Sequence, residues 1–247
     1  DFSPAISNPK TLILGAGAQV GVFVAMIGSL LLASVGIFDF GLPEAASIGI
    51  IGGADGPTTI FISTRMRELG NSLPNVDVQD IVGATAVAAY SYMALVPIIQ
   101  PPIIKMLTTK SERQIKMEYS PKEVSKRAKI LFPIICTLVI SILVPKASPL
   151  VGIMMFGNLL KESGVVPRLS NTAQNELMNI VIIILGLAVG GTMPGSVFLQ
   201  WQTIGIFILG LVAFAAATIA GILIAKIMNL FFKNKINPMI GAAGVSA

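Results

Sequence analysis

Residues 52–58 read Gly52-Gly53-Ala54-Asp55-Gly56-Pro57-Thr58, and this stretch decides how the chain folds. Asp55 is the only charged residue between Glu44 and Arg65. A carboxylate inside a bilayer costs about 2.5–3.5 kcal/mol, so its position needs a compensating role. Glycine and proline interrupt helices, and irregular backbone in a membrane is tolerated only beside protein or water. We therefore expect two half-helices that meet at a break, with the Asp55 carboxylate at a cation site there.

The alternative is that these glycines only allow membrane helices to pack closely. An isolated Gly-Gly pair favours that interpretation. The uncompensated carboxylate inside Gly-Gly-x-Asp-Gly-Pro favours a functional site instead.

The composition identifies the class of protein. Of 247 residues, 54% are hydrophobic and 12% are charged, and the mean hydropathy is +0.83. A soluble domain carries about 25% charged residues. The sequence therefore predicts an all-α polytopic membrane protein. Because the chain begins at Asp1 without Met and stops at Ala247 in an apolar run, we expect a fragment or a processed form of a longer protein.

Histidine is absent and Cys136 is the only cysteine. This composition excludes a zinc site, a Cys-His nucleophile and an internal disulfide within these residues. Any proton chemistry must use carboxylates, tyrosine, lysine or water.

The first half of the chain alternates apolar and polar segments. Residues 11–38 carry no charge and predict a membrane span, and the broken segment follows at 45–64. Residues 65–80 are polar and predict a loop, and the uncharged residues 81–104 predict another span. We interpret residues 1–104 as the core of a first structural repeat.

Prolines and tyrosines interrupt the predicted span 81–104. Pro97 should kink it, and Pro101 with Pro102 should end its regular hydrogen bonding. Tyr90 and Tyr92 lie in mid-span, away from the interfaces where tyrosines gather. Each is therefore either a hydrogen-bonded core residue or part of an ion or proton path.

A basic loop covers residues 105–129, with eight Lys or Arg and three Glu residues. Its net charge equals the +5 of the whole chain. The positive-inside rule places this loop in the cytoplasm. The loop is either a topology signal alone or, in addition, a docking face for an acidic partner.

We interpret residues 130–235 as connecting spans. Their charges fit one alternation across the membrane, with residues 161–171 and 226–235 inside and residues 194–202 outside. This alternation requires the short segment 149–160 to cross, whereas a re-entrant segment is the alternative.

Residues 236–247 contain Asn237-Pro238 and a run of small residues that ends near Ser246. A similar text, Asn8-Pro9 before an apolar small-residue run, opens the chain. We therefore expect two inverted repeats with the site at their interface, as in many transporters, the second repeat being truncated here.

Four motifs carry a family resemblance: GGADGPTTIF at 52–61, AAYSYMALVPIIQPP at 88–102, MMFGNLLKESGVV at 154–166 and KINPMIGAAGVSA at 235–247. In this order they closely resemble the β subunit of the sodium-pumping biotin-dependent decarboxylases. That family includes the oxaloacetate, methylmalonyl-CoA and glutaconyl-CoA decarboxylases. The resemblance covers nearly the whole chain.

The resemblance implies a multi-pass subunit of the bacterial inner membrane. It would accept carboxybiotin, release carbon dioxide with consumption of a proton, and move sodium outward. The implied partners are a carboxyltransferase subunit, a biotin carrier domain, a small membrane-anchor subunit and membrane lipid, with a homotrimeric β subunit and no nucleic acid. The implied cofactors are sodium and biotin, the latter held by a partner.

The resemblance also implies roles for particular residues. Asp55 would be the central sodium and proton residue, and Tyr92 would handle protons. The implied sodium ligands are Asp55, Asn237, Gly241 and Ser246, and the implied site backbone comprises Gly52, Gly53, Gly56, Pro57 and Thr58. An expected arginine lies beyond Ala247, so the carboxybiotin pocket is incomplete in this sequence and its residues stay unassigned.

The oxygen chemistry fits sodium, because hard cations prefer oxygen ligands. A bound cation favours the ionised carboxylate, and an empty apolar site favours the protonated form, so one aspartate can exchange sodium for a proton. The rival prediction is a non-enzymatic sodium/proton or sodium/solute antiporter, which would carry the same broken helix. A purely structural membrane anchor leaves Asp55 without a reason.

Overall fold

The helices of this protein are seen in a computed structural model that describes residues 2–7, 11–53, 55–74, 78–117, 124–191, 195, 199–232 and 235–244. Within those ranges every regular element is a helix. Four described helical stretches are long and apolar enough to cross a bilayer: Leu12–Ser34, Val82–Leu107, Pro167–Gly191 and Trp201–Phe231. The predicted all-α polytopic membrane protein is confirmed.

The chain divides into two compact units. Residues 11–118 and 189–247 form one unit, and residues 1–10 and 119–188 form the other. The first of these contains the Gly-Gly-x-Asp-Gly-Pro stretch and the Asn237 segment, so we call it the site unit. The inverted repeat remains a prediction, and Asn8-Pro9 lies outside the described residues.

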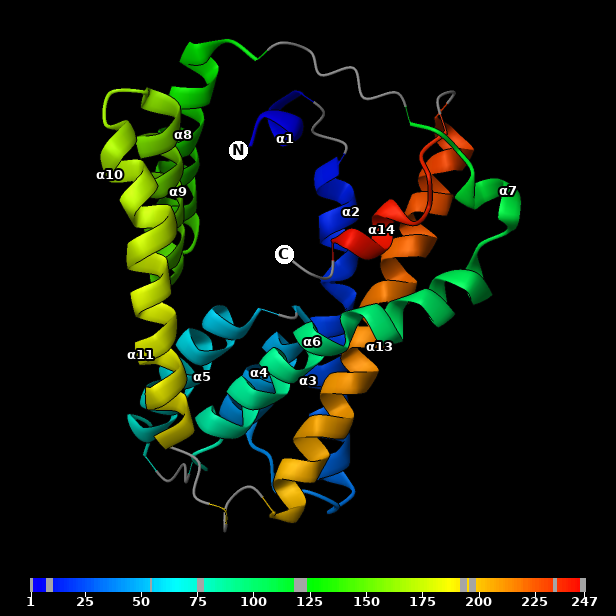
Figure 1. Cartoon of the computed structure of the whole chain (residues 1–247). Coiled ribbons are helices and arrows are strands. Elements are labelled where there is room, and N and C mark those ends of the chain that lie inside the picture. Colours follow the sequence, from blue (N-terminus) through cyan, green and yellow to red (C-terminus); the bar gives the residue numbers. More distant parts are fainter. Residues whose placement is uncertain are drawn as a thin grey trace. The chain divides into compact units, whose positions relative to one another are not determined.

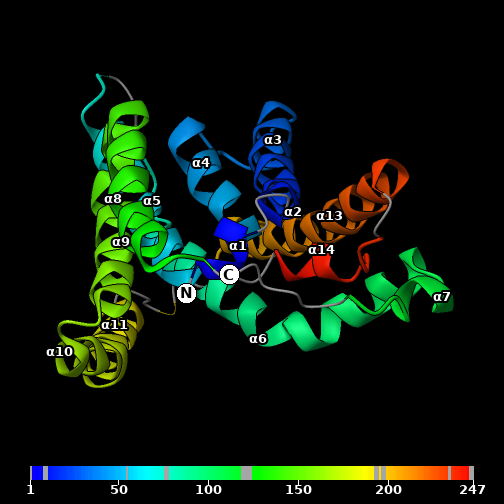
Figure 2. The same cartoon turned by 90° about the horizontal axis from the view of Figure 1, so that it is seen from above.

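Helix α13 (Trp201–Phe231) is the centre of the site unit. It packs against α2 (Thr11–Ala18), α3 (Val20–Ser34) and α6 (Val82–Leu107), as Figures 1 and 2 show. Its buried face carries a line of small residues three or four positions apart: Gly210, Ala213, Ala217, Gly221 and Ala225. Small side chains let membrane helices approach closely, so this line explains how three neighbours share one helix.

A broken helical hairpin lies beside α13. Helix α4 (Leu42–Ile50) is followed by the 3-10 turn η1 (Ile51–Gly53) and then by α5 (Gly56–Asn71). The two helices run back along each other, because Gly70 near the end of α5 lies against Pro43 at the start of α4. With 9 and 16 residues, each is shorter than the roughly 20 residues that a span needs. The predicted break is present, and the two outer ends of the hairpin lie together.

Helix α5 corrects the expectation of a loop over 65–80. It stays helical as far as Asn71. An ion pair of 2.7 Å between Arg65 and Glu68, three positions apart, stabilises this polar end. The loop begins only at Ser72.

Helix α6 also differs from expectation, because it continues through Pro101 and Pro102 to Leu107. Proline removes backbone donors, but its fixed φ is compatible with a helix. Next to these prolines, the side chain of Gln100 donates a hydrogen bond through Nε2 to the carbonyl of Ala242 at 3.0 Å.

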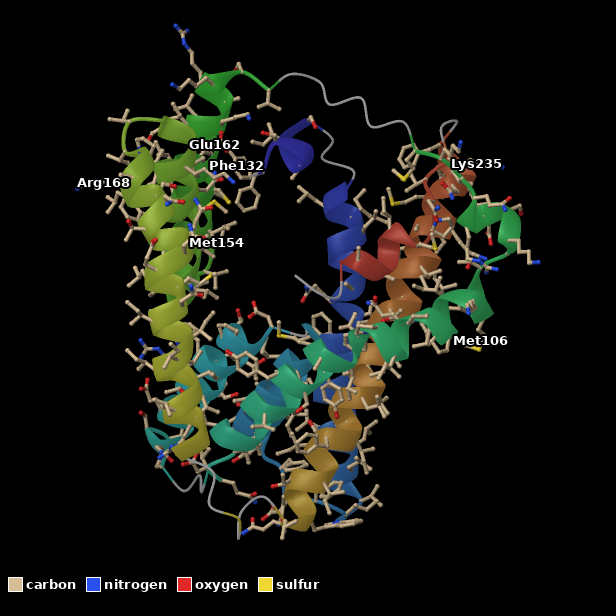
Figure 3. All side chains as sticks on the ribbon, viewed as in Figure 1. Met106, Phe132, Met154, Glu162, Arg168 and Lys235 are labelled. Atoms are coloured by element: carbon tan, nitrogen blue, oxygen red, sulfur yellow. The ribbon has the colours of Figure 1, made fainter. Side chains whose placement is uncertain are left out.

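The other unit is built on a helical hairpin. Helices α8 (Lys126–Leu143) and α9 (Ser148–Ser163) pack along each other and are joined by the turn η2 (Pro145–Ala147). The labelled Phe132 and Glu162 lie on this pair in Figure 3. Phe132 contacts Phe2, close to α1 (Ser3–Ser7), with ring centroids 5.4 Å apart, and Glu162 pairs with Lys129 at 3.6 Å.

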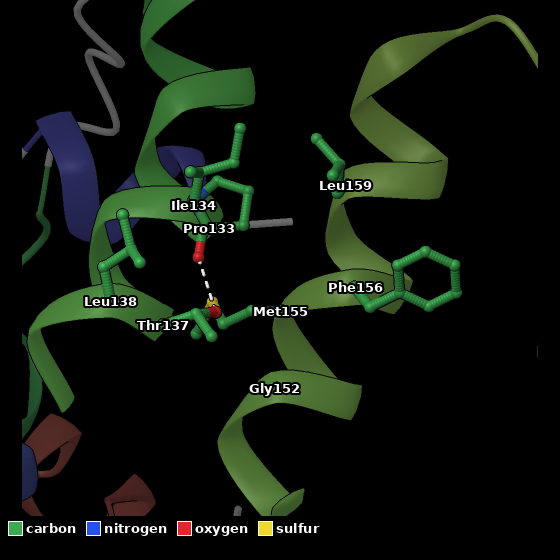
Figure 4. A pocket seen from close by; sticks show the side chains of 8 residues that line it. All are labelled: Pro133, Ile134, Thr137, Leu138, Gly152, Met155, Phe156 and Leu159. Carbon is green, nitrogen blue, oxygen red and sulfur yellow. Dashed lines mark hydrogen bonds between the residues drawn. The ribbon is translucent and has the colours of Figure 1, made fainter. Parts of the chain in front are cut away.

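An apolar groove of about 310 Å³ lies between α8 and α9 (Figure 4). Thr137 on its wall donates to the Pro133 carbonyl at 2.7 Å and so turns its hydroxyl away from the apolar lining. Helix α9 ends at Gly164, which has the left-handed φ of 68° that favours glycine. Helix α9 has 16 residues and is not among the four long apolar helices, so the crossing of residues 149–160 remains a prediction.

One long helical stretch follows this hairpin in the chain. Helix α10 (Pro167–Thr172), the π-helical turn η3 (Ala173–Leu177) and α11 (Met178–Gly191) follow one another without a gap. Proline near the first position suits the start of α10, since its missing donor would be unpaired there in any case.

Candidate functional site

The tip of the broken hairpin is held against α3. A Cβ atom on Gly52 would lie 2.7 Å from the carbonyl carbon of Gly21 and 2.8 Å from the amide nitrogen of Val22. Only glycine permits this approach of two backbones. The glycine therefore fixes where η1 ends and the connection to α5 begins.

Asp55 sits at the N-terminus of α5. Its backbone is extended, with φ −117° and ψ 105°. One carboxylate oxygen accepts the amide of Thr58 at 3.2 Å, and the other accepts the Thr58 hydroxyl at 2.6 Å. The Asp55 carbonyl accepts the Thr59 hydroxyl at 2.6 Å. Pro57 lies in the first turn, where a missing backbone donor costs nothing.

Helix capping explains an oxygen at position 55 but not a charge. Neutral Ser, Thr and Asn cap helices as well as Asp does. The helix dipole offsets part of the carboxylate's cost. Within the described residues, however, no cationic side chain pairs with Asp55. A carboxylate in this setting is suited to a mobile cation.

Tyr90 lies directly on the first turn of α5. A Cβ atom on Gly56 would lie 2.6 Å from Cε1 and 2.7 Å from Cε2 of the Tyr90 ring. Of the two mid-span tyrosines, Tyr90 is thus the one that the structure brings to the break.

Tyr92 faces α13 instead. Its hydroxyl donates to the carbonyl of Phe207, and its ring lies against Gly210. The side chain is buried, with 4% of its surface exposed. In this arrangement Tyr92 joins α6 to α13, and the described residues show no hydrogen bond between Tyr92 and Asp55.

The carboxy-terminal segment packs on the same unit. The short helix α14 (Ile240–Ala243) contacts α13 and α2. Gly241 meets Gly221 backbone to backbone, so its glycine is required by packing. The Asn237 amide donates to the carbonyls of Arg113 and Ile115 at 3.0 and 3.1 Å, and its oxygen accepts the Met239 amide at 3.1 Å.

The predicted site residues therefore fall into two groups. Gly52, Gly53, Asp55, Gly56, Pro57 and Thr58 form the hairpin tip, whereas Asn237 holds the short helix α7 (Lys110–Arg113) of the basic loop. No hydrogen bond joins Asn237 to Asp55 in the part of the chain that the structure describes. Ser246 lies outside that part.

Sequence reasoning missed the hydroxyl groups that continue from Asp55. Thr59 and Ser63 follow it at four-residue intervals, and both side chains are buried. That spacing, which puts them on one face of a helix, was readable in the sequence. Which of Tyr90 and Tyr92 lies at the break was not readable in the sequence, because it depends on which helices pack on each side of α6.

The donor set around Asp55 suits a hard cation. In the described ranges no three His, Cys, Asp or Glu side chains gather in a metal-binding group. The oxygens at the tip come from one carboxylate, the Thr58 and Thr59 hydroxyls and backbone carbonyls. Sodium as a transported ion accepts such ligands, as other hard cations do.

Comparison with known proteins supplies the family. The family described as "Na+-transporting oxaloacetate decarboxylase beta subunit" matches residues 1–247. The oxaloacetate decarboxylase beta chain of Klebsiella pneumoniae is 55% identical over 247 residues, which is 100% of this chain and 54% of the relative. The methylmalonyl-CoA decarboxylase subunit beta of Propionigenium modestum is 52% identical over the whole chain and 58% of its own length.

The glutaconyl-CoA decarboxylase subunit beta of Acidaminococcus fermentans is 51% identical over the whole chain, which covers 61% of that relative. The chain thus spans somewhat more than half the length of these relatives. A match along every residue, together with a broken membrane hairpin that carries its aspartate, leads to one assignment. The chain belongs to the family of Na+-transporting oxaloacetate decarboxylase beta subunits.

Proposed function

We propose that this chain is part of the membrane subunit that decarboxylates carboxybiotin and couples the reaction to outward sodium transport. The observation that carries the proposal is the Asp55 carboxylate, which caps α5 at a helix break without a cationic partner among the described residues. Family membership supports a sodium-transporting role for the complete protein.

Asp55 performs two tasks in this proposal. Sodium binds to the ionised carboxylate with help from the neighbouring hydroxyl and carbonyl oxygens. When sodium leaves, a proton takes its place, because a bare charge in an apolar setting is costly. Release of carbon dioxide from carboxybiotin consumes one proton, and Asp55 supplies it. Each turnover thereby resets the carboxylate for the next sodium ion.

The other predicted site residues keep supporting roles in the proposal. Asn237, Gly241 and Ser246 would complete the oxygen ligands from the side of the second repeat. Tyr92 would pass protons, for which its hydroxyl must leave the Phe207 carbonyl during turnover. The packing of Tyr90 beside Asp55 supports a role in ordering the site.

The proposed assembly follows from the same family. A carboxyltransferase subunit, a biotin carrier domain and a small membrane-anchor subunit would join a trimer of the complete β subunit in the bacterial cell membrane. The biotin stays covalently attached to its carrier. The basic loop 105–129 offers positive charge to an acidic face of a soluble partner.

The test is Asp55→Asn in the full-length subunit, purified in its complex and placed in proteoliposomes. Asparagine keeps the cap and removes the charge. Avidin-sensitive uptake of radioactive sodium and sodium-dependent carbon dioxide release should both fall by about a hundredfold or more. Glu68→Gln is the matched control, because Glu68 is exposed and pairs with Arg65 at 2.7 Å. Retention of both activities by Asp55→Asn would overturn the proposal.

A further inference from the structure

Helix α5 buries its polar face. Its buried residues are Gly56, Thr59, Ser63 and Gly70, none of which is a large apolar residue. The apolar run 60–62 on the same helix is only half-buried. In a membrane, ionisable side chains that turn toward the protein interior mark pathways for ions or protons, and Asp55 stands at the start of this face. The buried face of α5 therefore calls for an explanation beyond packing.

The buried hydroxyls continue directly from Asp55. Residues four apart on a helix have Cβ atoms about 5–6 Å apart, so Asp55, Thr59 and Ser63 form a row. The Thr59 hydroxyl donates to the Asp55 carbonyl at 2.6 Å, and the Ser63 hydroxyl lies 3.0 Å from that of Thr85 on α6. No more than 1% of the surface of any of these hydroxyl residues is exposed. Each oxygen keeps a lone pair that can face a cation.

The row reaches a narrow crevice between α4, α5 and the start of α6. Ser63 lines this crevice together with Ser47 and Glu44. It lies where the hairpin opens, at the end of α6 opposite to the basic loop. The positive-inside rule puts that end outside the cell. The crevice is too narrow for a water molecule, so passage of an ion requires α4 and α5 to separate.

The buried carboxylate of Glu44 supports an ion path at this crevice independently of the hydroxyl row. Only 2% of its surface is exposed. One carboxylate oxygen accepts a hydrogen bond from the backbone amide of Gln79 at 2.8 Å, and no described ion pair includes Glu44. Arg67 lines the same crevice but pairs with Asp80. The dipole of α4 favours a carboxylate in its first turn, yet a buried charge without a counter-charge is costly. The surroundings of the Glu44 carboxylate are therefore suited to binding a mobile cation.

We infer that Glu44, Ser63 and Thr85 form the outward leg of the ion path, with Glu44 as a sodium site near its exit. Sodium leaves Asp55, passes Thr59 and the Ser63–Thr85 pair, and pauses at Glu44 before release. The inference rests on the proposed sodium transport. It adds an exit route and a second sodium site on α4.

The experiment measures product inhibition in proteoliposomes that contain the complete complex. Sodium inside the vesicles binds from the exit side and slows decarboxylation. In Glu44→Gln and Ser63→Ala, the luminal sodium concentration that gives half-inhibition should rise about tenfold, because a ligand of the exit site is lost. The external sodium concentration that gives half-activation should stay within about twofold of wild type, because loading occurs at Asp55.

Matched controls lie on the same helix. Thr64→Ala and Glu68→Gln alter exposed residues and should keep both wild-type constants. Ser63→Thr retains a hydroxyl and should also keep them, so Ser63 carries the test even if Glu44→Gln assembles poorly. Wild-type luminal inhibition in Ser63→Ala would overturn the exit path. Absence of avidin-sensitive sodium uptake in the wild-type complex would instead overturn the proposed function.

Discussion

At the scale of single residues, Asp55 has a structural and a proposed chemical role that different substitutions separate. Its carboxylate accepts two hydrogen bonds from Thr58 and so caps α5. The cap needs only an acceptor, whereas exchange of sodium for a proton needs the charge. Stability and activity should therefore respond differently to the same position.

Asp55→Asn should leave the free energy of unfolding almost unchanged, and Asp55→Ala should lower it by about 0.5–2 kcal/mol through loss of the cap. Thermal unfolding of the detergent-solubilised complex, followed by light scattering or tryptophan fluorescence, measures the difference. Equal loss of stability in both variants would contradict a cap held by a neutral acceptor. Both variants are expected to lose sodium transport.

Gly56 allows Tyr90 to lie on the helix start. Gly56→Ala should destabilise the protein by about 1–3 kcal/mol, because the new methyl group overlaps the ring. Adding Tyr90→Ala to Gly56→Ala should recover part of the loss, since it empties the space. The thermal midpoints of the two single variants and the double variant provide the measurement. Additive losses would show that the two residues do not touch.

Residue-level prediction from the sequence succeeded where one residue type carries the signal. A lone carboxylate among glycines and proline pointed to a helix break, and the break is present. The choice between Tyr90 and Tyr92 depends on which helix faces each side of α6. Periodicity in one chain segment does not contain that information, so the resemblance favoured Tyr92 whereas the structure brings Tyr90 to the break.

At the scale of helices, the spans were predictable because uncharged runs of sufficient length have few alternatives. The ends of helices were less predictable. Helix α5 continues into polar sequence because Arg65 and Glu68 pair along its surface. Helix α6 continues past three prolines. In both cases the helix runs on past the local composition that suggested an end.

Contact between α13 and α14 depends on two glycines. A Cβ atom on Gly221 would lie 2.8 Å from the Gly241 carbonyl carbon, and one on Gly241 would lie 2.9 Å from the Ile222 amide nitrogen. Gly221→Ala should therefore cost about 1–3 kcal/mol of stability. Gly186→Ala is the control, because no atom lies within 4 Å of the added carbon, and its better helix propensity should stabilise by up to about 1 kcal/mol. Thermal unfolding compares the two, and equal effects would contradict the packing.

At the scale of the whole site unit, the basic loop and the carboxy-terminal segment are joined. Glu112 of α7 lies 3.1 Å from Lys226 of α13, and Thr109 and Glu112 form a capping box. Asn237 adds two hydrogen bonds to the same loop. The proposed docking face for a soluble partner is therefore tied directly to the segment that would complete the sodium site.

The contact between α7 and α13 through Glu112 and Lys226 should weaken in acid. The hydrogen bond from the Thr109 amide, with help from Lys226, holds the pKa of the Glu112 carboxyl below its usual value. Its contribution to stability is therefore present above the unfolded pKa of about 4.3 and is lost as the pH falls through the lower folded pKa. Between about pH 5 and about pH 3, the thermal midpoint of wild type should fall more steeply than that of Glu112→Gln. Parallel curves would contradict this role.

Asn237 offers the most direct test of the connection between loop and segment. Asn237→Ala removes both hydrogen bonds to the carbonyls of Arg113 and Ile115, so this part of the loop should open more often and expose its amide groups to water. Amide hydrogen exchange over residues 108–117 should rise about tenfold, as expected for roughly 1.4 kcal/mol of lost local stability. Asn175→Ala is the control, because among the described residues the Asn175 side chain bonds only to Asn171, and it lies in the other unit. Unchanged exchange in Asn237→Ala would mean that α7 is held without Asn237, and that movement of the carboxy-terminal segment is not transmitted through Asn237 to the loop where a soluble partner is proposed to dock.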